Sequence, residues 1–238
     1  MGGLDVELPL YDRLRASRRP LAKRILGLLL REGREFSHKE LLEALGLKSE
    51  DKSKLSNNLD VLKNLNFVVR EKRAPVRLKF KTPLCFVAGT PNVPYAYLGL
   101  LGVRDGWEVS ETETALGVLG DLGISFERVV VASTYSAIGT WSGAIDSRLG
   151  IEWLVMSEDD FNRVEVVEDR VKLKVFELVR DYVLIMDCTS GTRPAGIAFY
   201  SLASRFKVPL VYVYEPEKKL IWLISRDMLK KELEGVYL

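Results

Sequence analysis

Residues 183–193 read VLIMDCTSGTR, an uninterrupted apolar run that leads directly into a loop of small and hydroxylated residues. A strand without polar alternation is typical of a parallel sheet that is covered on both faces. Pro194 comes directly after the loop, and proline is favoured in the first turn of a helix. The stretch therefore predicts a buried strand, a tight loop and a helix N-terminus, as in an α/β fold.

Further strands and helices alternate on both sides of this stretch. Apolar strand candidates lie at 95–101, 128–132, 209–214 and 220–224, and helices are expected at 111–122, 194–206 and 227–233. Alternation of this kind predicts a mostly parallel, Rossmann-like sheet. We expect residues 95–238 to form one α/β domain.

The first third of the chain has a different pattern. In chain order, the expected elements are helices at 20–33, 37–46 and 49–65, followed by strands at 67–70 and 76–80. Three helices followed by a basic two-stranded wing are typical of a winged helix-turn-helix. We expect this DNA-binding domain to span residues 1–82, with 83–94 as a linker or an extra wing strand.

Composition and charge bound the class of protein. The chain has 238 residues, of which 47% are apolar and 29% charged, as in ordinary soluble globular proteins. Its net charge of +2 conceals an asymmetry, because residues 1–82 hold 19 Lys/Arg and 11 Asp/Glu (net +8) and the remainder holds 16 and 22 (net −6). A basic first domain favours a polyanionic partner, although solvated surface charge is the alternative explanation.

Several functional classes lack their sequence signals. Residues 1–10 have no basic start followed by an apolar run, so we expect no signal peptide, no membrane association and a cytoplasmic location. Cys85 and Cys188 stand in apolar contexts and His38 is the only histidine, which disfavours a disulfide or a metal site. No G-x-G-x-x-G or P-loop pattern occurs, so neither a dinucleotide nor any other cofactor is expected.

Three loops follow predicted strands, at the sheet edge where α/β proteins bind ligands. The candidate ligand-binding residues are Leu101, Gly102 and Arg104 in the first loop, Ser133, Thr134 and Tyr135 in the second, and Thr189, Ser190, Gly191, Thr192 and Arg193 in the third. Small and hydroxylated residues beside arginines favour a phosphate-binding cleft. Ordinary turns, in which Ser or Thr caps a helix, are the alternative.

The run 183–193, with the helix and the strand 209–214 that follow it, resembles the signature of CRISPR-associated Rossmann fold (CARF) domains, Asp-x-Thr-Gly-Gly-Thr/Ser-Lys. The resemblance covers roughly residues 95–222 and includes a small-residue loop at 101–102. It implies a homodimer whose paired loops enclose a cyclic oligoadenylate made by a type III CRISPR complex in antiviral defence. Ser190 and Arg193 depart from the signature, but arginine retains a bidentate phosphate contact.

The basic N-terminal domain has its own candidate interface with double-stranded DNA. The expected DNA-binding residues are Lys52, Lys54, Ser56, Asn57 and Asn58 on the third helix and Lys72 and Arg73 in the wing. Asparagine can read adenine and lysine can pair with guanine or phosphate, while wing cations contact the backbone. The alternative is a winged helix that serves in dimerisation or protein docking.

These patterns support a ligand-responsive, CRISPR-associated transcription regulator and leave two alternatives open. One is a ring nuclease, in which Ser133, Thr189 and Arg193 assist attack of a ribose 2′-hydroxyl on the adjacent phosphate without a metal. The other is a repressor that senses a different nucleotide. Trp107 and Trp141 lie near the predicted ligand loops, where they can stack on adenine or contribute to a dimer interface.

Overall fold

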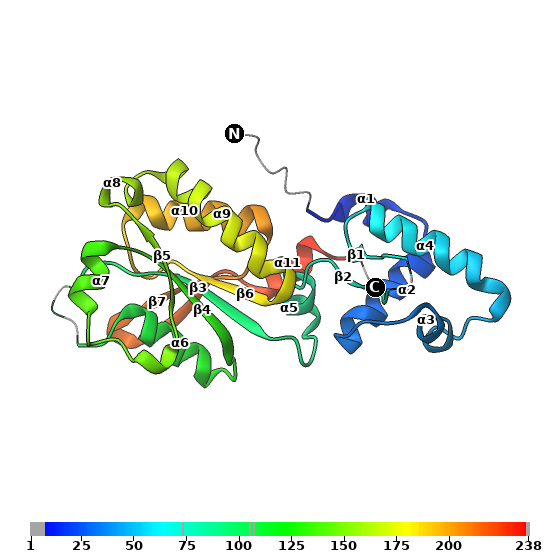
Figure 1. The fold of residues 1–238 in the computed structure, drawn as a ribbon, viewed down its shortest axis with the longest axis horizontal. Coiled ribbons are helices and arrows are strands. Elements are labelled where there is room, and N and C mark those ends of the chain that lie inside the picture. Colours follow the sequence, from blue (N-terminus) through cyan, green and yellow to red (C-terminus); the bar gives the residue numbers. More distant parts are fainter. Residues whose placement is uncertain (1–7, 73, 105, 107, 237–238) are drawn as a thin grey trace. The chain divides into compact units, whose positions relative to one another are not determined.

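The structure is a computed structural model that describes residues 8–72, 74–104, 106 and 108–236. Within this part the chain divides into two compact units, drawn as a ribbon in Figure 1. The first unit runs to Val93 and takes up the chain again from Asp227, while the second is Pro94–Arg226. Each unit buries its own set of apolar side chains.

Short helices make up most of the first unit. In chain order it contains α1 (Tyr11–Ala16), α2 (Pro20–Glu32), α3 (His38–Ala44), the 3-10 turn η1 (Ser49–Asp51), α4 (Lys52–Asn64), β1 (Val68–Val69), β2 (Arg77–Leu78), α5 (Leu84–Ala88) and α11 (Arg226–Glu232). β1 and β2 pair antiparallel, and an isolated bridge joins Phe36 to Val76. The three helices and the hairpin expected from the sequence are present, with shorter strands than predicted.

Local sequence explains how α2, α3 and α4 form and pack. α3 begins at a capping box, in which Ser37 Oγ accepts from Glu40 N at 3.2 Å and Glu40 Oε2 accepts from Ser37 N at 2.7 Å. α2 and α4 lie against each other and bury Ile25, Leu55 and Leu59 completely. Apolar residues three or four apart share one helix face, which accounts for this contact.

The structure corrects the prediction for residues 83–94. Residues Leu84–Ala88 form the helix α5 and not a wing strand, with Cys85 N donating to Lys81 O and Val87 N to Pro83 O, while residues 89–94 contain no helix or strand and lead to the boundary between the units. Its apolar side chains are buried, and Gly89 ends it in the left-handed region at φ +66°. A short apolar run is equally compatible with a strand and with a buried helix, so the sequence alone did not show which of the two forms here.

The C-terminal helix belongs to a different unit from the one that the sequence predicts. The sequence assigns residues 227–238 to the α/β domain, whereas the chain from Asp227 clusters with the first unit. Leu229, Leu233 and Val236 are buried, and the Arg15 guanidinium donates to the carbonyl of Glu232. The apolar spacing of a helix identifies the face that is buried but not the core that receives it.

The second unit is built on one six-stranded sheet. Its strands are β3 (Tyr95–Leu100), β4 (Phe126–Thr134), β5 (Glu152–Met156), β6 (Val183–Asp187), β7 (Leu210–Tyr214) and β8 (Lys219–Ile224). Their spatial order is β5-β4-β3-β6-β7-β8, with parallel pairing throughout except between β7 and β8. This is a Rossmann-like order with an antiparallel edge strand, so the predicted α/β fold class is confirmed.

Helices cover both faces of this sheet. The helical elements are α6 (Glu111–Asp121), α7 (Tyr135–Trp141), η2 (Ser147–Leu149), α8 (Glu158–Phe161), α9 (Val164–Asp181), α10 (Arg193–Phe206) and η3 (Glu215–Glu217). Figure 1 shows α9 and α10 side by side above the sheet and α6 below it. Of the helices that the structure describes, none is long and apolar enough to cross a membrane.

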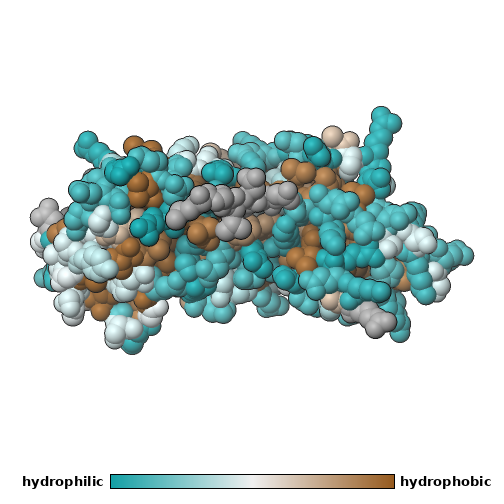
Figure 2. Space-filling view, turned by 45° about the horizontal axis from the view of Figure 1, so that its top comes forward, coloured by the Kyte–Doolittle hydropathy of each residue, from teal (hydrophilic) through white to brown (hydrophobic). Residues whose placement is uncertain are grey.

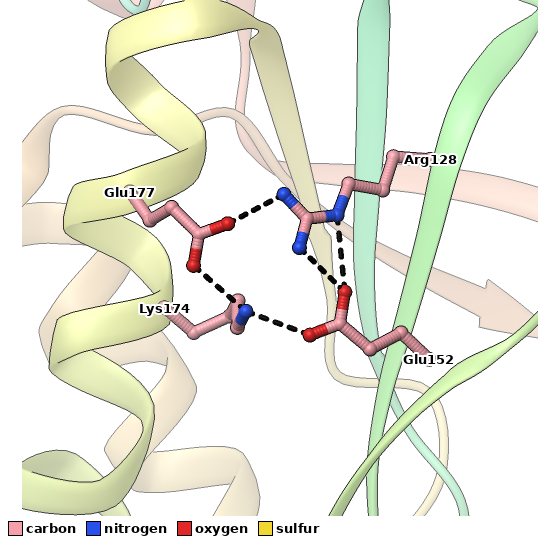
Figure 3. A network of polar contacts seen from close by, with 4 residues as sticks. All are labelled: Arg128, Glu152, Lys174 and Glu177. Atoms are coloured by element: carbon pink, nitrogen blue, oxygen red, sulfur yellow. Dashed lines mark hydrogen bonds and ion pairs between the residues drawn. The ribbon is translucent and has the colours of Figure 1, made fainter.

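A closed ring of four charged side chains joins α9 to the sheet (Figure 3). Arg128 near the start of β4 contacts Glu152 of β5 at 2.6 Å and Glu177 of α9 at 2.5 Å. Lys174 of α9 contacts the same two carboxylates at 2.7 Å each. Because cations and anions alternate around the ring, each charge at this amino-terminal edge of the sheet is neutralised by two neighbours.

Candidate functional site

Strands β3 and β6 are neighbours in the sheet, and from them the strand order runs in opposite directions, so their carboxyl ends form the topological switch point at which α/β folds bind ligands. Here the Gly102 N–H donates to Ser190 Oγ at 2.8 Å. A Cβ on Gly102 would lie 3.3 Å from Gly191 N, and one on Gly191, whose φ is +85°, would lie 3.2 Å from the Cβ of Leu100. Both positions therefore favour glycine, and the first and third predicted loops meet at this point.

Asp187, at the end of β6, holds the third loop in place. One of its oxygens accepts from Thr189 N at 2.8 Å and from the Thr189 hydroxyl, and the other accepts from the Tyr97 hydroxyl at 2.5 Å. The Thr189 hydroxyl in turn accepts from Val213 N at 2.8 Å. The carboxyl group is only 1% exposed, and burial raises the pKa of Asp187 to about 6.

The same loop begins the helix α10. Thr192 Oγ accepts from Ala195 N at 3.4 Å as an N-cap and donates to the Phe161 carbonyl at 2.8 Å. Pro194 occupies the first turn, as predicted, and Arg193 is exposed. The loop thus places the positive end of a helix dipole beside an exposed guanidinium, an arrangement that favours anions.

The second predicted loop, after β4, is largely internal. Ser133 is fully buried and its hydroxyl donates to the Leu101 carbonyl at 2.9 Å. Thr134 is also buried and caps α7 by accepting from Ala137 N at 3.2 Å. Tyr135, by contrast, is 78% exposed. In this loop, Tyr135 is therefore the predicted residue whose side chain reaches solvent.

Trp141 links the first and second loops rather than facing a ligand. Its indole N–H donates to the Gly102 carbonyl at 2.9 Å, and the side chain is only 2% exposed. The backbone of Arg104 donates to Thr140 Oγ at 3.0 Å, and its guanidinium lies 5.2 Å from the centre of the indole ring. A ring buried to this extent does not present a face on which adenine can stack, one of the two roles considered for Trp141, and Trp107 lies outside the described residues.

The predicted ligand residues thus come together but divide into two groups. Buried side chains that position the loops are those of Leu101, Ser133, Thr134 and Ser190. Residues that are exposed at the surface are Arg104, Tyr135, Gly191 and Arg193, while Gly102, Thr189 and Thr192 are half-buried. The hydroxyls of Ser133 and Thr189, suggested as catalytic groups, both have partners inside the protein.

Sequence reasoning missed a fourth loop at this edge, after β5. Ser136 Oγ donates to Glu158 Oε1 at 2.5 Å, and this bond lowers the pKa of the Glu158 carboxyl. Phe161, three residues later, lies against Gly191 and accepts from Thr192. The available signal was Ser157 followed by Asp160, a spacing typical of an N-capped helix.

The predicted DNA-binding residues are only partly on one surface. Lys52, Lys54 and Asn57 of α4 are exposed, as is Lys72 of the hairpin, whereas Arg73 lies outside the described residues.

Two α4 positions correct the prediction. Asn58 is 9% exposed and its amide donates to the Lys54 carbonyl at 2.8 Å, so it faces the core instead of a partner. Ser56 is half-buried and accepts from the Arg70 guanidinium at 2.6 Å.

A hollow of about 540 Å³ separates α3, the end of α4 and the hairpin. Its cationic lining residues are Lys63, Arg70 and Lys72, beside His38. Burial, followed by the charges of Arg70 and Lys52, lowers the pKa of His38, so this imidazole is neutral near pH 7. The acidic residues Asp60 and Glu71 also line the hollow, and Asp60 contacts Arg70 at 2.7 Å, so its lining carries charges of both signs.

Comparison with known proteins adds weak structural likenesses. No protein-family model matches the chain, and no curated protein matches it. The chain resembles solved structures of a Vibrio cholerae protein (9% identity, TM-score 0.44), of Enterococcus italicus Csm6 bound to cyclic hexa-2′-fluoro-hexa-dAMP (17%, 0.44) and of Sulfobacillus thermosulfidooxidans Can2 in complex with cyclic tetra-adenylate (12%, 0.38).

These likenesses are partial. The three alignments cover 56%, 61% and 55% of this chain and 34%, 39% and 35% of the other chains, respectively. The chain therefore spans little more than a third of each solved protein. At this level of identity and similarity they assign no function to the chain.

Proposed function

We propose that this chain is a ligand-responsive DNA-binding regulator of CRISPR-associated antiviral defence, and that it senses cyclic oligoadenylate through a homodimer of its second units. The observation that carries the proposal is the contact between the loops of Gly102 and Gly191 beside the exposed Arg193. The resemblance of residues 183–193 to the CARF signature supports the same assignment.

The loops at the carboxyl ends of the strands offer groups that suit a ring of phosphates and adenines. Arg193 stands at the N-terminal turn of α10, where the helix dipole and the guanidinium both favour a phosphate. Arg104 and Tyr135 are exposed at the neighbouring loops, and a tyrosine ring can stack on a base. A second copy related by a two-fold axis doubles each group, which suits a symmetric ring.

The proposed pairing surface begins at the same helix. Ile197 and Tyr200 are 58% and 51% exposed, and they follow Arg193 at spacings that share one face of α10. Figure 2 shows apolar side chains, in brown, at the surface of the second unit. A contact along this stripe places the Arg193 side chains of two copies on the same side of a dimer.

The first unit supplies the proposed DNA contact. Its helices and hairpin follow the order of a winged helix-turn-helix, with Lys52, Lys54 and Asn57 exposed on α4 and Lys72 on the hairpin. In such modules the last helix enters the major groove and the wing contacts the backbone.

Replacing both Lys54 and Lys72 with alanine is expected to weaken binding to duplex DNA and to reduce the salt slope by about 2, at roughly 0.9 per phosphate contact. Fluorescence anisotropy at several salt concentrations measures both quantities. The matched control is Arg170→Ala with Arg180→Ala, two exposed cations of α9. A salt slope identical to that of the parent would remove Lys54 and Lys72 from the interface.

Ligand and DNA are coupled only through a difference in affinity. Cyclic oligoadenylate changes DNA binding if it binds the DNA-competent dimer more or less tightly than the alternative arrangement. The reciprocal effect follows, so operator DNA changes ligand affinity by the same factor.

The experiment that tests the proposal is calorimetric titration of the full chain with cyclic tetra-adenylate and cyclic hexa-adenylate, followed by chromatography of the recovered ligand. We expect one intact ring bound per two chains. Failure of both rings to bind would contradict the ligand assignment. Recovery of a linear product would make the protein a ring nuclease, a function that the internal partners of Ser133 and Thr189 disfavour.

A further inference from the structure

The first unit carries a second group of cations, away from the predicted DNA-binding residues. Residues 12–24 include six basic side chains, of Arg13, Arg15, Arg18, Arg19, Lys23 and Arg24, and one acidic side chain, that of Asp12. They lie in α1, at the start of α2 and in the turn between the two helices. Arg15 and Arg24 donate to backbone carbonyls, and we call three other exposed residues, Arg13, Arg18 and Arg19, the α1–α2 basic cluster.

The α1–α2 basic cluster is not neutralised within the part of the chain that the structure describes. There, no carboxylate lies within 4.0 Å of any of its three guanidinium groups. Other arginines of the same unit do have such partners, for example Arg34 with Glu40 at 2.9 Å. Among the described residues, the cluster therefore has no acidic partner, and its positive charge is exposed to solvent.

Part of this positive charge lies at the N-terminus of α2, where it disfavours helix formation. Arg19 is the N-cap of α2, makes no side-chain capping bond, and no acidic residue occupies the first turn. Cations at the positive end of a helix dipole are unfavourable, and α3 and α6 of the same chain begin instead with a serine–glutamate capping box. Violations of local preference are typical of functional surfaces, because an external partner then compensates the cost.

The position of the cluster relates it to the proposed DNA-binding helix. α1 rests on the C-terminal end of α4, since Leu10 N donates to Leu65 O at 3.0 Å and the rings of Tyr11 and Phe67 lie 5.6 Å apart. Lys52 and Lys54 stand at the other end of α4, which has 13 residues. A helix of this length extends about 20 Å, or roughly six base pairs of duplex at 3.4 Å each.

We infer that the α1–α2 basic cluster is a second contact to the backbone phosphates of duplex DNA, flanking the contact made by α4. The inference rests on the proposed DNA binding and adds to it a sequence-independent anchor. Arginine suits this role because its planar fork can hold a phosphate through two hydrogen bonds. Contacts of this kind fix the register of a protein on the duplex while the bases specify the site.

The test compares the full-length protein with the variant Arg18→Ala/Arg19→Ala by fluorescence anisotropy on a duplex of about 30 base pairs over a range of salt concentrations. We expect affinity to fall about tenfold and the salt slope to decrease by about 2, at roughly 0.9 per phosphate. The control variant Arg170→Ala/Arg180→Ala removes two exposed cations from α9 and is expected to bind as the parent does.

Reversing the charge of Arg18 and Arg19 separates their effect on DNA binding from their effect on stability. Arg18→Glu/Arg19→Glu places acidic residues at the start of α2, where they favour the helix dipole, so the melting temperature is expected to stay the same or rise. DNA affinity is expected to fall further than in the alanine variant. A purely structural role for these arginines would not give higher stability together with weaker binding.

The outcomes distinguish this inference from the proposed function. Unchanged affinity and salt slope in both arginine variants, with DNA still bound by the parent, would overturn the basic cluster alone. Loss of binding to phosphatidylserine vesicles with unchanged DNA binding would also overturn it and assign the surface to a membrane. A parent protein that binds no duplex at any salt concentration would overturn both the inference and the proposed regulator.

Discussion

The two edges of the second unit's sheet, at the amino ends and at the carboxyl ends of its parallel strands, differ in whether their charged side chains are paired. At the amino-terminal edge, Arg128 and Lys174 each contact two glutamates, and the four side chains form a closed ring. At the carboxyl-terminal edge, the loop hydroxyls are satisfied internally while Arg193 remains exposed beside the start of α10. The charges of the amino edge are therefore paired with one another, whereas the carboxyl edge keeps an exposed cation where we propose that an anionic ligand binds.

The largest expected effect comes from breaking the glycine contact at the carboxyl edge. Gly191→Val forces a branched side chain into φ +85° and against Leu100, at a cost of about 4 kcal/mol from strain and overpacking together. We expect a large drop in the urea midpoint and loss of ligand binding. Gly120→Ala is the control, because its Cβ meets nothing within 4 Å and alanine favours the α6 helix.

The next effect is a pH dependence that belongs to Asp187. Because burial raises its pKa to about 6 in the folded protein, its contribution to stability is fully present below pH 4 and is lost as pH rises through 6. A shift of this size corresponds to a change on the order of 3 kcal/mol.

Melting curves between pH 4 and pH 7 measure this contribution. The variant Asp187→Asn is expected to remove most of the pH dependence that the parent shows in this window. Parallel pH profiles for parent and variant would show that Asp187 titrates normally.

Arg193→Ala tests the exposed charge of the carboxyl edge. Loss of a charge-assisted contact to a phosphate is expected to raise the dissociation constant for cyclic oligoadenylate about 10- to 100-fold, or roughly 2 kcal/mol. Thermal stability should not change, because the guanidinium is exposed at the helix start. Calorimetry of this variant beside Arg180→Ala, an exposed arginine of α9, makes the comparison; equal affinities would exclude Arg193 from the site.

The smallest expected effect comes from opening the ring at the amino edge. Lys174→Met leaves Glu152 and Glu177 with one cation between them, which is expected to cost about 1 kcal/mol because both carboxylates are partly solvated. Chemical denaturation measures this loss, and it should shrink at high salt. Ligand affinity is expected to match that of the parent; a large change in affinity would contradict the separation of the two edges.

The sequence predicted the features that are determined by residues adjacent to one another in the chain. The apolar run at 182–186 predicted a strand buried on both faces, and β6 is buried along its whole length. Pro194 likewise predicted the first turn of α10. These features depend only on neighbours in the chain, so no knowledge of the tertiary structure was needed.

Two other features were missed, one because its local pattern was obscured and one because it depends on distant parts of the chain. The 18-residue helix α9 was not predicted, although Val167, Val171 and Val175 recur at helical spacing, because charged residues fill the positions between them. Ser133 resembled a ligand-binding residue, but the register of β3 and β4 brings the Leu101 carbonyl to its hydroxyl. No local pattern indicates such a contact.

Amide hydrogen exchange with and without cyclic tetra-adenylate tests the preformed carboxyl edge most directly. The account predicts slower exchange on ligand binding in residues 189–196, where Gly191 and the first turn of α10 lie. It predicts no change around Arg128 and Glu152 at the amino edge. Protection confined to the amino edge, or none in either region at saturating ligand, would contradict the claim that the carboxyl edge is the binding site.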